Sequence, residues 1–159
     1  ASEASAARIG GSGDARAGAA SAPGGFAAAS GDSIYRIVFQ LDADLTLRLT
    51  GALGATGDGP GGALALLELS TVDPLEEPLL LRFERSAEDA ADPLAIDAIV
   101  TLRGGVEYRL LVLARAFGDS LGGDGPAALR AEFGFELAEV PEPGSALLVA
   151  LGLAALRRR

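Results

Sequence analysis

The chain has 159 residues and a net charge of −9 at neutral pH, and its sequence contains no cysteine, histidine, lysine or tryptophan. Without cysteine or histidine, the chain has no disulfide, no thiolate metal site and no Ser-His-Asp or Cys-His catalytic centre. An acidic chain is repelled by nucleic-acid phosphates, so we expect neither DNA nor RNA binding. Together these exclusions favour a protein that is not an enzyme.

Residues 1–32 consist almost entirely of alanine, glycine and serine and show no hydrophobic period. Ordering the backbone costs about 1–2 kcal/mol per residue, and small side chains bury too little area to offset this cost. The composition therefore predicts a flexible, disordered arm. Its small-residue beginning, Ala1-Ser2-Glu3-Ala4, is compatible with a leader removed on export.

Residues 33–139 form short runs in which apolar and polar residues alternate. Alternation of this kind, with β-branched and aromatic residues, is typical of strands that bury one face. The run at 63–69 is rich in leucine and is also compatible with a short helix, and residues 86–91 are compatible with one helical turn. The runs predict seven strands, over residues 34–39, 45–50, 63–69, 79–83, 96–102, 106–116 and 132–137.

Glycine, proline and aspartate separate these runs, for example at Gly57-Asp58-Gly59-Pro60 and Asp92-Pro93. Arg103-Gly104-Gly105-Val106 resembles a tight hairpin turn between paired strands. About seven short strands with regular turns and no helical repeat predict an all-β domain over residues 33–139. Its expected architecture is an antiparallel β-sandwich or a jelly roll.

The C-terminal segment, residues 140–159, differs from the rest of the chain. Two prolines at 141 and 143 prevent it from continuing a strand, because proline lacks a backbone donor and has a fixed φ. Residues 145–156 are uncharged and almost wholly apolar, and three arginines follow them directly. A helix packed on a core shows a polar stripe, which this run lacks, so a packed helix is the weaker interpretation.

This run is better explained as a short hydrophobic helix in a membrane, with its arginines on the cytoplasmic side. Twelve helical residues span about 18 Å, whereas the hydrocarbon core of a bilayer is about 30 Å thick. Snorkelling arginines and local thinning of the bilayer recover part of the difference. The segment is therefore expected to be a short anchor that suits later removal.

A Pro-Glu-Pro motif, an apolar run and a terminal arginine cluster, in this order, resemble the PEP-CTERM sorting domain. By this resemblance the recognition motif is Pro141, Glu142 and Pro143, and the cytoplasmic stop is Arg157, Arg158 and Arg159. The membrane segment would comprise Ala146, Leu147, Leu148, Val149, Ala150, Leu151, Gly152, Leu153, Ala154, Ala155 and Leu156.

The resemblance implies that a Gram-negative bacterium exports the protein and holds its precursor in the inner membrane. There an exosortase, a membrane-embedded cysteine transpeptidase-like enzyme, recognises the motif. The family is associated with exopolysaccharide and with biofilm or floc matrix, which implies a location at the cell surface or in the extracellular matrix. The resemblance is limited to residues 140–159, so the body of the protein inherits no activity from it.

Carboxylates are the chemical candidates in the body of the chain. Oxygen ligands in glycine-rich loops suit calcium, although the same residues are common in turns and no EF-hand spacing is present. We predict no cofactor and keep calcium as the one candidate. The candidate ligands are Asp42, Asp44, Asp58, Asp119 and Asp124.

Three functions remain open from the sequence. The first is a structural or interaction protein of the surface or matrix. The alternative is an extracellular glycan-binding module, with or without calcium, which the absence of tryptophan weakens. A hydrolase that uses the carboxylate pairs Asp42 with Asp44, or Glu132 with Glu136, is a more remote third hypothesis.

Overall fold

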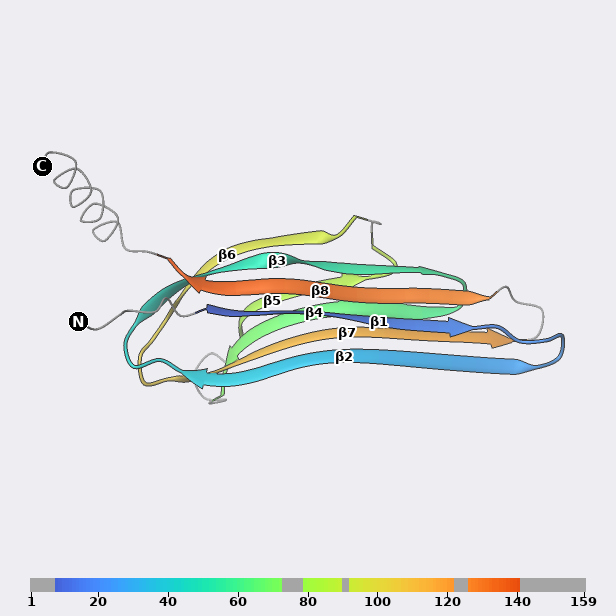
Figure 1. Cartoon of the computed structure of the whole chain (residues 1–159), viewed down its shortest axis with the longest axis horizontal. Coiled ribbons are helices and arrows are strands. Elements are labelled where there is room, and N and C mark those ends of the chain that lie inside the picture. The colour runs from blue at the N-terminus through green and yellow to red at the C-terminus, as the bar shows by residue number, and fades with distance from the viewer. Residues whose placement is uncertain (1–7, 73–78, 90–91, 122–125, 141–159) are drawn as a thin grey trace, which may run out of the picture.

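The computed structural model describes residues 8–72, 79–89, 92–121 and 126–140, and these residues contain strands and connections but no helix (Figure 1). The ambiguous run at 63–69 is therefore a strand, and residues 87–89 form a turn. The eight strands are β1 (Arg8–Ala19), β2 (Phe26–Gln40), β3 (Leu45–Asp58), β4 (Gly61–Thr71), β5 (Leu79–Ser86), β6 (Leu94–Leu102), β7 (Glu107–Leu121) and β8 (Ala127–Glu139).

The strands form two four-stranded antiparallel sheets, in the orders β1-β8-β3-β6 and β2-β7-β4-β5. Four pairs, β1 with β8, β2 with β7, β3 with β6 and β4 with β5, follow the pattern of one long hairpin folded over on itself. This connectivity is that of a jelly roll. The predicted all-β antiparallel sandwich is confirmed, and the strand order selects the jelly roll between the two predicted architectures.

The prediction that residues 1–32 form a flexible arm is wrong for residues 8–32, and residues 1–7 lie outside the described part. β1 pairs with β8 along all of its 12 residues, and β2 starts at Phe26 and pairs with β7 along 15 residues. All seven predicted runs lie in or overlap strands, but β1 is an eighth strand that was not predicted. Backbone hydrogen bonds to distant strands order this segment, and its side-chain composition does not record them.

The turn at residues 103–106 does not join paired strands, so the prediction of a hairpin there is also wrong. It connects β6 in one sheet to β7 in the other. Gly105 has a φ of 79°, a conformation that favours glycine. The hydroxyl of Tyr108 accepts a hydrogen bond from the N–H of Arg103 at 2.7 Å and fastens the turn to the core.

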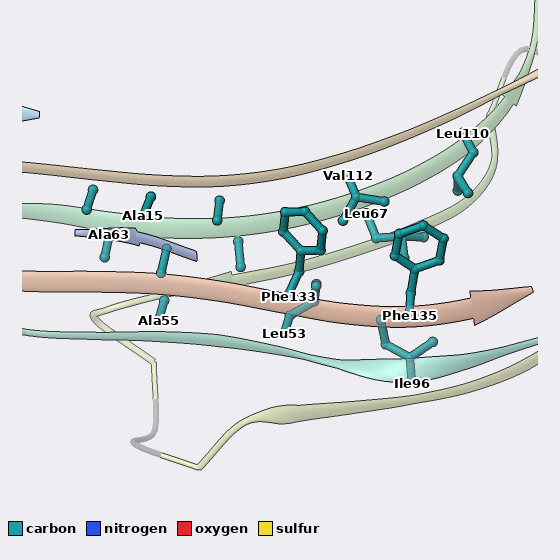
Figure 2. Close-up of a cluster of buried hydrophobic side chains, with 14 of the residues drawn as sticks. Ala15, Leu53, Ala55, Ala63, Leu67, Ile96, Leu110, Val112, Phe133 and Phe135 are labelled. Carbon is teal, nitrogen blue, oxygen red and sulfur yellow. The ribbon is translucent and has the colours of Figure 1, made fainter. Parts of the chain in front are cut away.

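The core lies between the sheets, and its side chains change in size along the strands. We call the end where β8 finishes the tail end, and the opposite end the far end. Figure 2 shows Phe133, Phe135 and Leu110 in the part of the core toward the tail end, whereas Ala55 and Ala63 lie toward the far end. Small side chains let the sheets approach more closely, so the alanine content of the chain is part of its packing.

Candidate functional site

The C-terminal segment leaves the sandwich from an inner strand. β8 lies between β1 and β3, so hydrogen bonds hold it on both sides. Its last residue, Glu139, lies opposite Leu47, and the N–H of Val140 donates to the carbonyl of Thr46 at 2.9 Å. The described chain is therefore fastened to its neighbour up to the residue that precedes Pro141.

Aromatic packing supports β8 close to this exit point. Phe133 and Phe135 are buried on the inner face of β8, with ring centroids 6.4 Å apart. Tyr35 of β2 meets Phe135 edge to face at a centroid distance of 5.1 Å, a geometry that aromatic pairs prefer. The strand that carries the C-terminal segment is thus anchored in the part of the core with the largest side chains.

The family model of the PEP-CTERM protein-sorting motif matches residues 139–159. This match confirms the resemblance drawn from the Pro-Glu-Pro motif, the apolar run and the arginines. It supports exosortase-type sorting of an exported protein, with a membrane-anchored precursor that an exosortase processes. The match begins at Glu139, the last residue of β8, so the motif directly follows the sandwich.

Other comparisons add little. No curated protein matches the chain. Among solved structures, a chain in the structure of infectious bursal disease virus, Gx strain, is 13% identical, with a TM-score of 0.26. The alignment covers 94% of this chain and 47% of the viral chain, so this protein spans about half the length of its viral counterpart. A likeness at that TM-score carries no argument about fold or function.

The predicted sorting residues lie outside the described part of the structure. These are Pro141, Glu142 and Pro143, the apolar residues 146–156 and the arginines 157–159. Among residues 8–72, 79–89, 92–121 and 126–140, no helix is long and apolar enough to cross a bilayer.

The calcium candidates do not converge on one site. Asp42 and Asp44 lie in the β2–β3 connection at the tail end, where Oδ1 of Asp44 accepts a hydrogen bond from the N–H of Gly104 at 2.9 Å. Asp58 ends β3 and Asp119 lies near the end of β7, both at the far end. The 14 residues of β3 span about 45 Å at 3.3 Å per residue, which separates the two pairs.

The prediction that all of these aspartates form one calcium site is therefore wrong. Within the described residues, no three acidic side chains are grouped so that they could hold a metal ion. The remaining candidate, Asp124, lies outside the described residues. Asp44 instead fastens the β6–β7 turn to the β2–β3 connection, which is the ordinary role of aspartate in turns.

The outer face of the sheet that contains β8 is covered by small residues and ion pairs. Glu136 pairs with Arg8, and Glu132 pairs with Arg130. The guanidinium of Arg48 donates two hydrogen bonds to the carboxylate of Asp97, at 2.8 and 2.7 Å, and these bonds lower the pKa of Asp97. The carboxylates predicted as a catalytic pair, Glu132 and Glu136, are thus partners of arginines.

A shallow depression of about 340 Å³ lies on the same face and is lined by Ser12, Asp14, Gly54, Arg130 and Glu132 among others. A methyl group added at Gly54 would lie 3.0 Å from Cγ of Glu132, so the Glu132 side chain covers this part of the floor. A general acid at neutral pH needs a raised pKa. Among the residues that the structure describes, the carboxyl groups with a changed pKa are Asp89 and Asp97, and both pKa values are lowered, that of Asp89 through hydrogen bonds from Ser86.

Sequence reasoning missed the apolar residues on the outer face of β2. Ile34 is 61% exposed, Val38 is 44% exposed and Phe26 is 66% exposed. The signal was present, because residues 34–39 carry apolar side chains at both even and odd positions. One set faces the core and the other faces outward, so a strand with two apolar faces was readable from the sequence.

Proposed function

We propose that the protein is a non-enzymatic component of the bacterial surface or extracellular matrix, delivered there through exosortase processing of its C-terminal segment. In this proposal its jelly roll has a structural or interaction role in a biofilm or exopolysaccharide matrix. The observation that carries the proposal is the match of the sorting motif to residues 139–159, directly after the last strand.

The position of the motif supports the proposal because it makes the sandwich and the signal separable. Every described strand ends by Glu139, and the recognition motif of the resemblance starts at Pro141. Processing at or beyond that motif leaves all eight strands in the mature protein. Because the strands run along the long dimension of the sandwich (Figure 1), the far-end connections lie about 45 Å from the end at which the sorting segment begins.

A glycan-binding module has weaker support, because both tyrosines face the core. Tyr108 is 3% exposed, and Tyr35 packs against Phe135. Neither ring therefore offers an exposed stacking platform for a sugar. Polysaccharide remains a proposed partner through the matrix location that the sorting signal suggests.

The test is the intact mass of the protein isolated from the surface or matrix of its native host. The wild-type protein should lack the residues beyond the Pro-Glu-Pro region. A variant with Pro141→Ala, Glu142→Ala and Pro143→Ala should accumulate in the membrane fraction with Arg159 retained. Pro93→Ala, which removes an exposed turn proline in the described domain, is the matched control and should be processed normally. Surface-located wild-type protein that still carries Arg159 would refute the proposal.

A further inference from the structure

Strand β2 forms a free edge of its sheet. Within the described residues it pairs with β7 alone, and Figure 1 shows it as the outermost strand along the lower side of the molecule. Its 15 residues contain no proline, and its register with β7 runs without a bulge from Phe26 to Gln40. Proline, bulges and short length are the usual devices that prevent an edge from pairing with another chain.

The other edges differ from β2. β5 has 8 residues and a register shift opposite Leu69 and Ser70, and β6 has 9 residues. β1 has 12 residues, but its outward side chains are small or charged: Arg8, Gly10, Ser12, Asp14, Arg16 and Gly18. β2 is therefore the longest edge and the one with the most apolar outer face.

The hydrogen-bonding pattern shows which residues of β2 face the free edge. The N–H of Asp119 donates to the carbonyl of Pro60, and the carbonyl of Glu107 accepts from the N–H of Val72. The backbone N–H and C=O groups of odd-numbered residues of β7 therefore point toward β4. Backbone groups alternate sides along a strand, so even-numbered residues of β7 bond toward β2, where they lie opposite odd-numbered residues. The even-numbered residues of β2 therefore present their N–H and C=O groups to the free edge.

These same residues are complementary to a second copy of the strand. If two β2 strands pair antiparallel about Ile34, each Asp32 lies opposite Arg36 of the other copy, on both sides of a central Ile34–Ile34 pair. Arg36 makes no ion pair within the described residues, so it is free to meet this carboxylate. Asp32 already bonds Arg115 at 2.8 Å and would gain a second cation.

A row of apolar residues also leads across the sheet to this centre. Ile34 lies opposite Leu113 of β7, which lies opposite Leu66 of β4. Ile34 is exposed, Leu113 is half-buried and Leu66 is buried. Pairing about Ile34 joins this row to the same row of the second copy. Cross-strand apolar neighbours of this kind stabilise a sheet.

We propose that a second copy of this chain binds the free edge of β2, antiparallel about Ile34, so that the two four-stranded sheets merge into one sheet of eight strands. Backbone hydrogen bonds supply the attachment, and the two Asp32–Arg36 contacts select the register. The inference uses only described residues of the sandwich and does not depend on the sorting segment. For a matrix protein it provides a way to link copies to one another.

The register can be tested by cysteine cross-linking, because the chain has no cysteine of its own. Directly opposed side chains lie about 4.5–5.5 Å apart at Cβ, within reach of a short bifunctional thiol reagent. The full chain with Ile34→Cys should yield a covalent dimer. Neither Ser30→Cys nor Val38→Cys should form a covalent dimer by itself, because residue 30 of one copy lies about 27 Å from residue 30 of the other. A mixture of the two variants should cross-link, because residue 30 lies opposite residue 38 of the second copy.

Ile99→Cys is the matched control, because Ile99 is also an exposed isoleucine on an edge strand, at 64% compared with 61% for Ile34. It should remain monomeric under the same conditions. Equal cross-linking of Ile99→Cys and Ile34→Cys would refute the proposal. Efficient cross-linking of Ser30→Cys alone would do the same, because it would require a different register.

Sedimentation velocity of the full chain in one mild detergent provides a second measurement. The wild-type protein should sediment as a concentration-dependent dimer. Arg36→Asp should raise the dissociation constant of the dimer by about tenfold or more, because it places two carboxylates opposite each other at both ends of the contact. Arg103→Asp makes the same charge change in an exposed turn outside β2 and should leave the dimer intact.

A compensating variant separates loss of pairing from loss of folding. Adding Asp32→Arg and Arg115→Asp to Arg36→Asp reverses every charge in the contact and retains the ion pair within the chain. This triple variant should dimerise again. A wild-type monomer at about 100 µM, or a triple variant as weak as Arg36→Asp alone, would refute the interface.

Discussion

The ion pair of Arg48 and Asp97 shows how single residues join neighbouring strands on the outer face. Arg48 lies on β3 opposite Ile99 of β6, and Asp97 lies two residues further along β6, so the two side chains are diagonal neighbours on the same face. Both side chains are more than half exposed, so solvent and salt weaken their attraction. The hydrogen bonds nevertheless favour the charged form of Asp97 and lower its pKa in the folded protein.

This lowered pKa predicts a small pH dependence of stability. A carboxyl whose pKa is lower in the folded than in the unfolded state stabilises the fold above its unfolded pKa, about 3.9. That stabilisation is lost as the pH falls through the folded-state pKa. Asp97→Asn should therefore lower the urea midpoint slightly at pH 6, and the difference from wild type should disappear in the acid range. The difference in urea midpoint at pH 6 should also become smaller at high salt, because salt screens the ion pair.

The control for this measurement is Asp42→Asn, which removes a carboxylate from an exposed connection at the same net charge. It should not reproduce the salt-sensitive difference at pH 6. A difference between wild type and Asp97→Asn that stays constant from pH 6 into the acid range would contradict the assigned cause.

At the scale of elements, the edge strands β1 and β2, one from each sheet, pack against each other on one side of the sandwich. Their inward residues toward the far end are mainly alanine and glycine, which keep the two backbones close. A methyl group added at Gly31 would lie 2.6 Å from the carbonyl oxygen of Arg16 on β1. The composition that predicted a flexible arm is thus the composition that lets these two strands pack together.

Gly31→Ala tests this close approach. The two strands would have to separate, and overpacking of this kind costs about 1–3 kcal/mol in the free energy of unfolding. Gly134→Ala is the matched control, because Gly134 also lies in a strand but has no atom within 4 Å of an added methyl group. It should be neutral or stabilise by up to about 1 kcal/mol. Equal urea midpoints for the two variants would contradict the packing.

At the scale of the whole molecule, the first and last strands are partners. β1 pairs with β8 along its full length, so the beginning of the sandwich supports the strand that carries the sorting segment. The larger core side chains also lie toward the tail end. The tail end is therefore the end that buries the larger apolar side chains.

Deletion of residues 1–19 should consequently abolish cooperative unfolding. It removes one of the two hydrogen-bond partners of β8 and the buried side chains of Ala15, Ala17 and Ala19. Deletion of residues 1–7, which keeps all of β1, is the control and should preserve the thermal transition followed by circular dichroism. An unchanged transition after deletion of residues 1–19 would show that this segment is a dispensable arm after all.

Local patterns in the sequence were sufficient for much of this protein. Alternation, together with β-branched and aromatic content, predicts seven of the eight strands, although the leucine-rich run at 63–69 was also compatible with a short helix. The motif Pro141-Glu142-Pro143, followed by an apolar run and arginines, identifies the sorting segment, because all of its parts are adjacent in the chain. Both signals are local, so neither requires knowledge of the fold.

Only the tertiary structure decided what depends on distant partners. β1 lacks large side chains and is ordered by its pairing with β8, and the turn at 103–106 joins two sheets and not two paired strands. The separation of Asp42 from Asp58 follows from the length of β3. The reason is common to all three: in a jelly roll most hydrogen bonds and contacts join residues far apart in sequence, and no local pattern records them.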